Sequence, residues 1–215
     1  MKIAFIGGGT MGEAILSALL EKKRAIPVGI CVSDISPGRR EYLSKQYGVI
    51  TTEDNRDAAA GKDIIILAVK PQQLPDVING LNGTLVETQV VISIVAGVKI
   101  STITERLGHR CIVRAMPNTP AQIGLGVTGW TATDDVTEAQ RDKARIILGS
   151  MGKEIFFADE GALDMVTAVS GSGPAYVFLF VEALTIGAEK LGLSPEDARE
   201  LVLRTLLGAA HLLET

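Results

Sequence analysis

The sequence contains few of the residues from which disulfide frameworks and metal sites are built. Two cysteines and two histidines occur among its 215 residues. Cys31 and Cys111 lie in separate apolar stretches without Cys-x-x-Cys spacing, and the histidines are His109 and His211. We therefore expect neither a disulfide framework nor a metal site.

Long basic or apolar runs are also lacking. Lysine and arginine number 21 against 25 acidic residues, which gives a net charge of −4, and no basic run suggests contact with a nucleic acid. The N-terminus becomes glycine-rich after four apolar residues, which is too short for a secretory signal. The charge-free stretch 165–181 is interrupted by serine, glycine and proline and falls short of a membrane span. We expect a cytoplasmic protein with a small-molecule partner, without nucleic acid or membrane.

Short segments rich in valine and isoleucine recur through the first three quarters of the chain. The expected strands are Lys2–Gly7, Val28–Ser33, Asp63–Val69, Val90–Ala96 and Cys111–Ala115, with weaker ones at Val127–Ala132 and Glu154–Phe157. The absence of polar alternation is typical of strands covered on both faces. Helices are expected between them at Met11–Arg24, Arg39–Tyr47, Gln72–Gly80, Ile100–Leu107 and Thr137–Met151. The pattern predicts an α/β fold with a doubly wound sheet over residues 1–158.

Residues 159–215 contain no further strand signal. Helices are expected at Leu163–Val169, Ala175–Leu191 and Pro195–Leu213. Gly192 can end one helix, while Ser194 caps the next with a proline at its first position. The last helix is apolar around most of its circumference and must be buried against something. Since so short a segment cannot bury it alone, we predict an all-α domain that forms a homodimer or larger oligomer.

The segment Gly7–Gly12 reads Gly-Gly-Gly-Thr-Met-Gly between the first strand and the first helix. This Gly-x-Gly-x-x-Gly pattern is typical of a Rossmann-type dinucleotide site. Gly7 permits the tight turn, Gly9 lets the backbone approach a pyrophosphate, and Gly12 allows close helix–strand packing. The following helix N-terminus presents free N–H groups to the phosphates.

The end of the second expected strand leaves the identity of the dinucleotide open. Asp34 follows Gly12 by 22 residues and is suited to a ribose 2′-hydroxyl, which favours NAD. Ser33 and Ser36, with the arginine pair 39–40, are suited to a 2′-phosphate, which favours NADP. The arginines are equally typical of a solvated helix face.

Ligands of open α/β sheets bind outside the carboxyl ends of the strands, where three segments meet. These are 70–71, 96–97 and 116–120, and ordinary turn chemistry explains each of them as well. The stretch 169–176 enters a long apolar helix with Pro174 at its start. It is suited either to a substrate carboxylate or to a plain helix cap.

Taken together, segments 5–12, 68–71, 95–98, 114–120 and 169–176 resemble the pyrroline-5-carboxylate reductase family over the whole chain. The resemblance implies an oxidoreductase that reduces 1-pyrroline-5-carboxylate to L-proline, the last step of proline biosynthesis. It implies NADPH as the preferred cofactor, with NAD also used by some members, an N-terminal Rossmann domain and a C-terminal helical domain that builds the dimer.

Positions that match the family supply the site residues. The expected cofactor-binding residues are Ile6, Gly7, Gly8, Gly9, Thr10, Met11, Ser33, Asn55, Ala68, Val69, Lys70 and Pro71. The expected substrate-binding residues are Asn118, Ser170, Gly171, Ser172 and Gly173. Ser33 would lie at the 2′-phosphate, and Lys70 either shapes the potential around the cofactor or is a partly exposed lysine.

No catalytic side chain is assigned. In the family, a helix like 198–213 is followed by further segments, including the loop with the threonine proposed near the imine nitrogen, and these segments are not in this sequence. The helical domain is therefore expected to be incomplete.

Two other functions remain as alternatives. One is a small Rossmann reductase of the β-hydroxyacid or prephenate dehydrogenase type, which relies on a lysine or histidine in its helical region. After Gly171 the chain offers only Lys190 and His211 for that role. The other is a non-enzymatic NADP-binding protein.

Overall fold

The computed structural model describes residues 1–215 in two units, Met1–Gly171 and Ser172–Thr215. The sequence placed the boundary between a cofactor domain and a helical domain after residue 158, and this division by function stays a prediction. Residues 159–171 belong to the first unit because they form helix α7 (Ala162–Val166) and a π-helical turn (Thr167–Gly171) beside the sheet.

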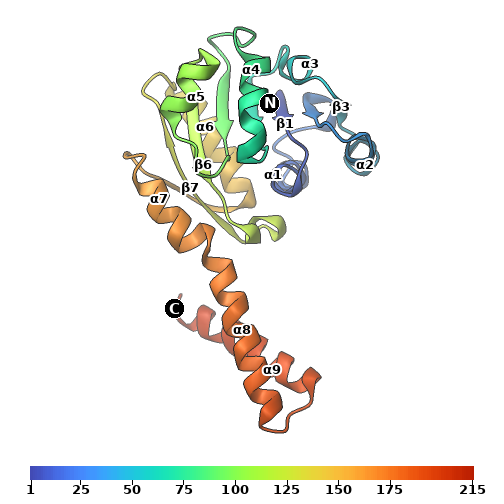
Figure 1. The fold of residues 1–215 in the computed structure, drawn as a ribbon, viewed down its shortest axis with the longest axis vertical. Coiled ribbons are helices and arrows are strands. Elements are labelled where there is room, and N and C mark those ends of the chain that lie inside the picture. Colours follow the sequence, from blue (N-terminus) through green and yellow to red (C-terminus); the bar gives the residue numbers. More distant parts are fainter. The chain divides into compact units, whose positions relative to one another are not determined.

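The first unit is built on one eight-stranded sheet (Figure 1). Its strands are β1 (Ile3–Ile6), β2 (Ile30–Ser33), β3 (Ile50–Thr52), β4 (Ile64–Leu67), β5 (Val90–Ser93), β6 (Ile112–Met116), β7 (Gly126–Ala132) and β8 (Gly152–Phe156). Their order is β3-β2-β1-β4-β5-β6-β7-β8, with every neighbouring pair parallel except β6 and β7. The register aligns Ile6 of β1 with Ser33 of β2 and Leu67 of β4, so these three strands end at one edge. The prediction of a doubly wound sheet is confirmed.

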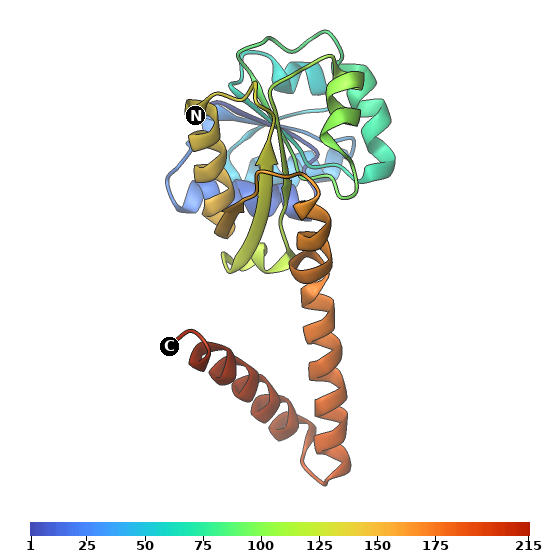
Figure 2. The same cartoon turned by 90° about the vertical axis from the view of Figure 1, so that its left-hand side faces the viewer.

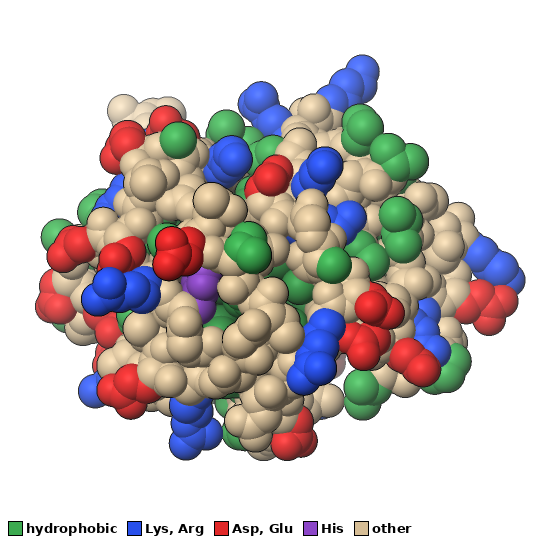
Figure 3. Space-filling model, turned by 90° about the horizontal axis from the view of Figure 1, so that it is seen from above, with side chains coloured by type: hydrophobic (Ala, Val, Ile, Leu, Met, Phe, Trp, Pro, Cys, Tyr) green, Lys and Arg blue, Asp and Glu red, His purple; other side chains and the backbone are tan.

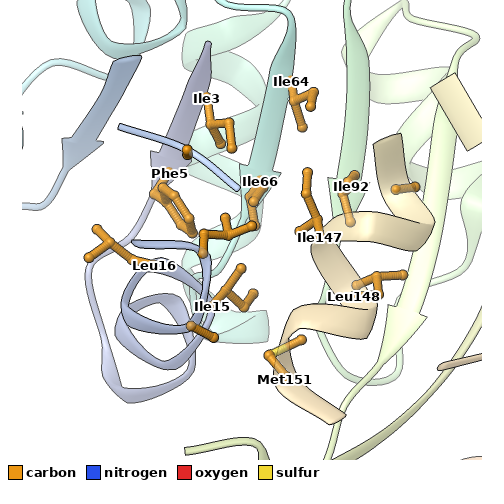
Figure 4. Packing of buried hydrophobic residues seen from close by; sticks show 14 of the residues in the cluster. Ile3, Phe5, Ile15, Leu16, Ile64, Ile66, Ile92, Ile147, Leu148 and Met151 are labelled. Atoms are coloured by element: carbon orange, nitrogen blue, oxygen red, sulfur yellow. The ribbon is translucent and has the colours of Figure 1, made fainter. Parts of the chain in front are cut away.

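Helices cover both faces of the sheet (Figure 2). Their bounds are α1 (Thr10–Glu21), α2 (Pro37–Tyr47), α3 (Asn55–Ala59), α4 (Leu74–Leu81), α5 (Ile100–Leu107) and α6 (Glu138–Leu148). Figure 4 shows side chains of α1 and α6 packed against those of β1, β4 and β5. Helices α3, α4 and α5 pack on the opposite face. The alternate residues of β1 and β4 enter opposite clusters, which explains why these strands are apolar throughout.

Two elements were not expected from the sequence, strand β3 and helix α3. β3 is an edge strand of three residues whose Ile50 is exposed, so it lacks the continuous apolar run of the inner strands. α3 has only five residues, and its start is marked by Asp54, whose side chain accepts the N–H groups of Arg56 and Asp57. Elements this short carry little periodicity of their own.

Arg114 on β6 forms a buried ion pair that ties α7 to the sheet. Its guanidinium lies 2.7 Å from Glu160 and 3.5 Å from Asp164, and the residue is 6% exposed. The same Glu160 oxygen accepts the N–H of Ile100 at the start of α5, at 2.7 Å. A single arginine therefore links three elements in a poorly solvated position.

Arg114→Ala is expected to lower the free energy of unfolding by about 3 kcal/mol, because Glu160 would stay partly buried without its cation. Urea unfolding followed by circular dichroism measures the change. Arg204→Ala is the control, since its ion pair with Glu200 lies on the exposed side of a helix and should contribute nothing measurable. Equal losses in the two variants would contradict the role assigned to burial.

The first unit also presents a mixed surface. Figure 3 shows one face, on which lysine and arginine side chains are interspersed with aspartate and glutamate. No single sign of charge dominates this face.

The second unit consists of helices α8 (Gly173–Lys190) and α9 (Pro195–Leu212). The predicted break between them is confirmed: Gly192 has φ 101°, and the Ser194 side chain accepts the Asp197 N–H. Within this chain α8 buries no residue, and α9 buries only Ala198 and Val202. Both helices therefore leave apolar surface uncovered.

Residues Ala162–Lys190 are long and apolar enough to cross a membrane, by length and composition alone. The sequence argument, which rested on the shorter charge-free stretch, was wrong about that length. The feature is weak evidence for a span, since a core helix of a soluble protein passes the same test.

Candidate functional site

A cavity of about 350 Å³ lies at the carboxyl ends of β1, β2 and β4. The expected cofactor residues that line it are Gly7, Gly9, Ser33, Asn55, Ala68, Val69 and Lys70. Asp34, the residue weighed for the ribose, also lines it. Ile35, Gln73, Asp76 and Val77 were not foreseen. Ile35 lies just after β2, Gln73 ends the short turn after β4, and the other two lie in the first turn of α4. The cavity thus lies where open α/β sheets bind ligands.

The glycine-rich loop has the geometry expected of it. Gly7 has φ 99°, and a Cβ added there would lie 2.7 Å from the carbonyl oxygen of Ala68. A Cβ at Gly12 would lie 2.6 Å from the carbonyl oxygen of Gly7. At Gly9 a Cβ would meet nothing within 4 Å, so the loop faces open space there. The predicted turn and packing functions of Gly7 and Gly12 are confirmed.

The N-terminus of α1 is available to an anion. Gly9 caps the helix with extended backbone and, having no side chain, makes no cap hydrogen bond. The first N–H groups of a helix lack intrahelical acceptors and carry the positive end of its dipole. Beside a cavity, such a helix start suits a phosphate.

Asp34 joins the end of β2 to the glycine loop. One carboxylate oxygen accepts the N–H of Gly8, and the other accepts the N–H of Ser36, each at 2.9 Å. These two bonds fix the carboxylate at the wall of the cavity. Each oxygen keeps a second lone pair for a ligand.

The two arginines weighed as phosphate ligands bind the protein itself. Arg39 donates to the carbonyl oxygen of Gly8 and pairs with Glu13 on α1. Arg40 donates to the carbonyl oxygen of Asp34 at 2.7 Å and lies 3.4 Å from Glu53. Both guanidinium charges therefore have carboxylate partners.

Glu13 is the centre of a polar cluster between α1 and α2. Its carboxylate accepts hydrogen bonds from Arg39, from Tyr42 at 3.0 Å and from Tyr47 at 2.7 Å. Partial burial raises the pKa of this carboxyl, but the bonds from Tyr47, Arg39 and Tyr42 outweigh burial and hold the pKa below its ordinary value. Glu13 is thus a stable anion and holds Arg39 in place.

Ser33 and Asn55 form one unit at the cavity. The Ser33 hydroxyl donates to the Asn55 side-chain oxygen at 2.6 Å, and Ser33 is fully buried. Because the side-chain oxygen of Asn55 accepts this bond, its NH₂ group is the part of the amide that can donate to a ligand.

Lys70 is the one cationic side chain that lines the cavity, and two anionic side chains, Asp34 and Asp76, line it as well. Lys70 is exposed, and its backbone N–H donates to the Gln73 side-chain oxygen at 3.2 Å in the short turn that follows β4.

The expected substrate residues do not line this cavity. Asn118 is 9% exposed, and its side-chain oxygen accepts the Val127 N–H at 2.9 Å, which joins its loop to β7. The Ser170 hydroxyl donates to the carbonyl oxygen of Val166 at 3.0 Å. A Cβ at Gly171 would lie 2.8 Å from the Met116 side chain. These three residues thus already make contacts within the first unit.

The serine–glycine segment, which suited either a carboxylate site or a plain helix cap, is not an open loop. Thr167–Gly171 is a π-helical turn, not a loop, and Ser172 has helical φ and ψ without a side-chain cap bond. A sequence of small residues does not reveal such a turn, because the π-helical form depends on how the backbone is packed. The substrate functions of Ser170, Gly171, Ser172 and Gly173 stay predictions.

Comparison with protein families finds two matches. Residues 2–97 match the model described as NADP oxidoreductase coenzyme F420-dependent, and residues 160–215 match the model described as pyrroline-5-carboxylate reductase dimerisation. A pyrroline-5-carboxylate reductase from Synechocystis is 42% identical over 214 residues, which cover 100% of this chain and 79% of the relative. One from Pseudomonas aeruginosa is 39% identical and covers 98% of this chain and 77% of its own length.

Solved structures that resemble this chain include members of the same family. A pyrroline-5-carboxylate reductase from Coxiella burnetii has a TM-score of 0.93 at 42% identity and covers 100% of this chain and 80% of its own. The Plasmodium falciparum enzyme, solved with NADP bound, has a TM-score of 0.90 at 30% identity, with coverage of 100% and 79%. A prephenate dehydrogenase from Aquifex aeolicus has a TM-score of 0.65 at 14% identity, with coverage of 99% and 88%, and shares the fold alone.

Proposed function

The chain belongs to the pyrroline-5-carboxylate reductase family, and from this premise we propose that it reduces 1-pyrroline-5-carboxylate to L-proline with NAD(P)H. The observation that carries the proposal is the cavity at the ends of β1, β2 and β4. A glycine-rich loop and a helix start without a side-chain cap lie at this cavity. The similarity to such reductases covers the whole length of this chain. The reaction is the last step of proline biosynthesis, and the cytoplasm is its proposed location.

The residues at the cavity fit a dinucleotide. Gly9, Thr10 and Met11 would hold the pyrophosphate, because the backbone there is open and belongs to a helix N-terminus. Ile6 and Gly8 shape this loop from behind. Ile6 is fully buried, and a Cβ at Gly8 would lie 2.6 Å from the Leu43 side chain.

The adenosine end of the dinucleotide would lie at the end of β2, and the nicotinamide end would lie at the end of β4. Ser33 and Asn55 would lie at the adenosine ribose, which Rossmann folds place at the end of the second strand. Ala68, Val69, Lys70 and Pro71 would border the nicotinamide. The bound NAD(P)H supplies the hydride.

The chain itself need not supply a strong acid. The imine carbon of the substrate accepts the hydride, and an imine that binds already protonated ends as an amine without a further proton donor. What the protein then provides is orientation and a suitable field. Lys70, the cation among the side chains that line the cavity, would supply part of this field.

A second copy of the chain would cover the helical region. The dimerisation model matches residues 160–215, and α8 exposes a continuous apolar series that includes Val177, Phe178, Leu179 and Phe180. So large an apolar patch is typical of a subunit interface. The proposed domains are therefore 1–158 for the cofactor and 159–215 for dimerisation and the substrate, with substrate contacts from Asn118 and residues 170–173.

The function is tested by following NADPH absorbance in the presence of 1-pyrroline-5-carboxylate, prephenate or a β-hydroxyacid, the last two with the oxidised cofactor. We expect turnover with 1-pyrroline-5-carboxylate and formation of proline, since the relatives with high identity carry that name. Turnover of prephenate or the hydroxyacid instead would contradict the proposal. Tight NADPH binding with no turnover of any substrate would support a non-enzymatic nucleotide-binding protein.

A further inference from the structure

The loop between β5 and α5, residues 94–99, adjoins the nicotinamide side of the proposed cofactor site. β5 lies beside β4 in the sheet, and the N–H of Ile94 donates to the Leu67 carbonyl oxygen at 3.1 Å. Beyond the sheet, Val69 and Val98 pack against the same apolar cluster. The loop therefore runs next to the segment after β4 that was proposed above to border the nicotinamide.

The far end of this loop is held by a side chain from another element. The residue before α5, Lys99, makes no side-chain cap hydrogen bond to the helix. Instead, a carboxylate oxygen of Glu160, which lies just before α7, accepts the N–H of Ile100 at 2.7 Å. A carboxylate at a helix start satisfies an N–H that has no intrahelical acceptor and interacts favourably with the helix dipole. Glu160 thus caps α5 from 60 residues away in the chain.

The capping carboxylate is itself held in place by Arg114. The guanidinium donates to the same Glu160 oxygen at 2.7 Å, and the arginine side chain is 7% exposed. Arg114 lies on β6 directly beside Ser93, the last residue of β5. The carboxylate therefore cannot move away from α5 without also breaking a bond to the sheet beside that loop.

We propose that Glu160 is a positioning residue for the nicotinamide half of the cofactor, on which it acts through the loop 94–99. The proposal rests on the cofactor site proposed above. Glu160 does not line the cavity, so its effect has to pass through the loop. The loop turns at Gly97, which has φ 73°, and the bond to Glu160 fixes it on the side away from β5. Hydride transfer demands a narrowly defined ring position, so a fixed neighbouring loop favours it.

Two variants separate this bond from the side chain that makes it. Glu160→Ala removes the acceptor of the Ile100 N–H, whereas Glu160→Gln keeps an oxygen that can accept it. Calorimetric titrations compare NADPH with 2′-phospho-ADP-ribose, which lacks only the nicotinamide ring, at a temperature where thermal unfolding shows each variant to be folded. This readout does not depend on turnover.

We expect Glu160→Ala to lower NADPH affinity about fivefold and to change the affinity for 2′-phospho-ADP-ribose by no more than about twofold. Glu160→Gln should bind both ligands within about twofold of the unchanged protein. Asp164→Ala is the matched control. Asp164 lies 3.5 Å from the same arginine, but no hydrogen bond joins it to α5, so both affinities should stay unchanged.

Three results would overturn the proposal and leave the cofactor site standing. No loss of NADPH affinity in Glu160→Ala, or equal losses for the two ligands, would mean that Glu160 only supports the fold. A loss in Asp164→Ala as large as in Glu160→Ala would assign the effect to Arg114 alone. A loss in Glu160→Gln as large as in Glu160→Ala would assign it to charge instead of the loop bond. Failure of the unchanged protein to bind NADPH would refute the cofactor site itself, and this inference with it.

Discussion

Gly7→Val is expected to lower NADPH affinity about a hundredfold and to destabilise the first unit by about 3 kcal/mol. Gly7 has φ 99°, a conformation that a β-branched residue rarely adopts. Its Cβ would also lie 2.7 Å from the Ala68 carbonyl oxygen and 2.9 Å from the Val69 side chain. Relief of both contacts requires the loop to move away from β4.

This movement should affect the cofactor more than the fold. The loop carries the helix start where the pyrophosphate is proposed to bind, so a displacement of a few tenths of an ångström misaligns its N–H groups. Fluorescence titration measures the affinity, and thermal unfolding measures the stability. Destabilisation without loss of affinity would place the dinucleotide elsewhere.

Gly38→Ala is the control for replacing a glycine near the site. Gly38 lies in the first turn of α2, has no unusual φ, and a Cβ there would meet nothing within 4 Å. Alanine in a helix is about 0.5–1 kcal/mol more favourable than glycine, so this variant should be slightly more stable and bind NADPH normally.

Val177→Asp is expected to weaken the proposed dimer by at least about a hundredfold. Val177 is 51% exposed within one chain and lies in the apolar series of α8, within the region that the dimerisation model matches. In a symmetric dimer the substitution occurs twice, and each copy would place a charge in apolar surroundings. Sedimentation velocity over a range of concentrations measures the change.

The matched control for this prediction is Val86→Asp. Val86 is similarly exposed, at 59%, but it lies in the loop before β5 in the first unit. It should leave the oligomeric state unchanged. If both variants dissociate to the same extent, or if neither does, α8 is not the centre of the interface.

Several features of this protein were determined by local sequence alone. The inner strands β1, β4 and β5 could be predicted because residues buried on both faces form uninterrupted apolar runs. The functions of Gly7 and Gly12 followed from a pattern in which each glycine meets a specific steric demand. The start of α9 followed from a serine cap ahead of a proline, which acts within a few residues.

Other features were decided only by tertiary structure. The sequence left Arg39 and Arg40 open as phosphate ligands, because their partners Glu13 and Glu53 lie on other elements and are brought close only by the fold. At the π-helical turn 167–171, Gly171 lies so close to Met116 of β6 that a Cβ would clash, a contact that no pattern of small residues contains. The bond from the Gly8 N–H to the Asp34 carboxylate likewise joins residues that are distant in the chain and is made only by the fold. Local sequence specifies backbone shape and burial, whereas the partners of Arg39 and Arg40 are supplied by residues that are distant in the chain.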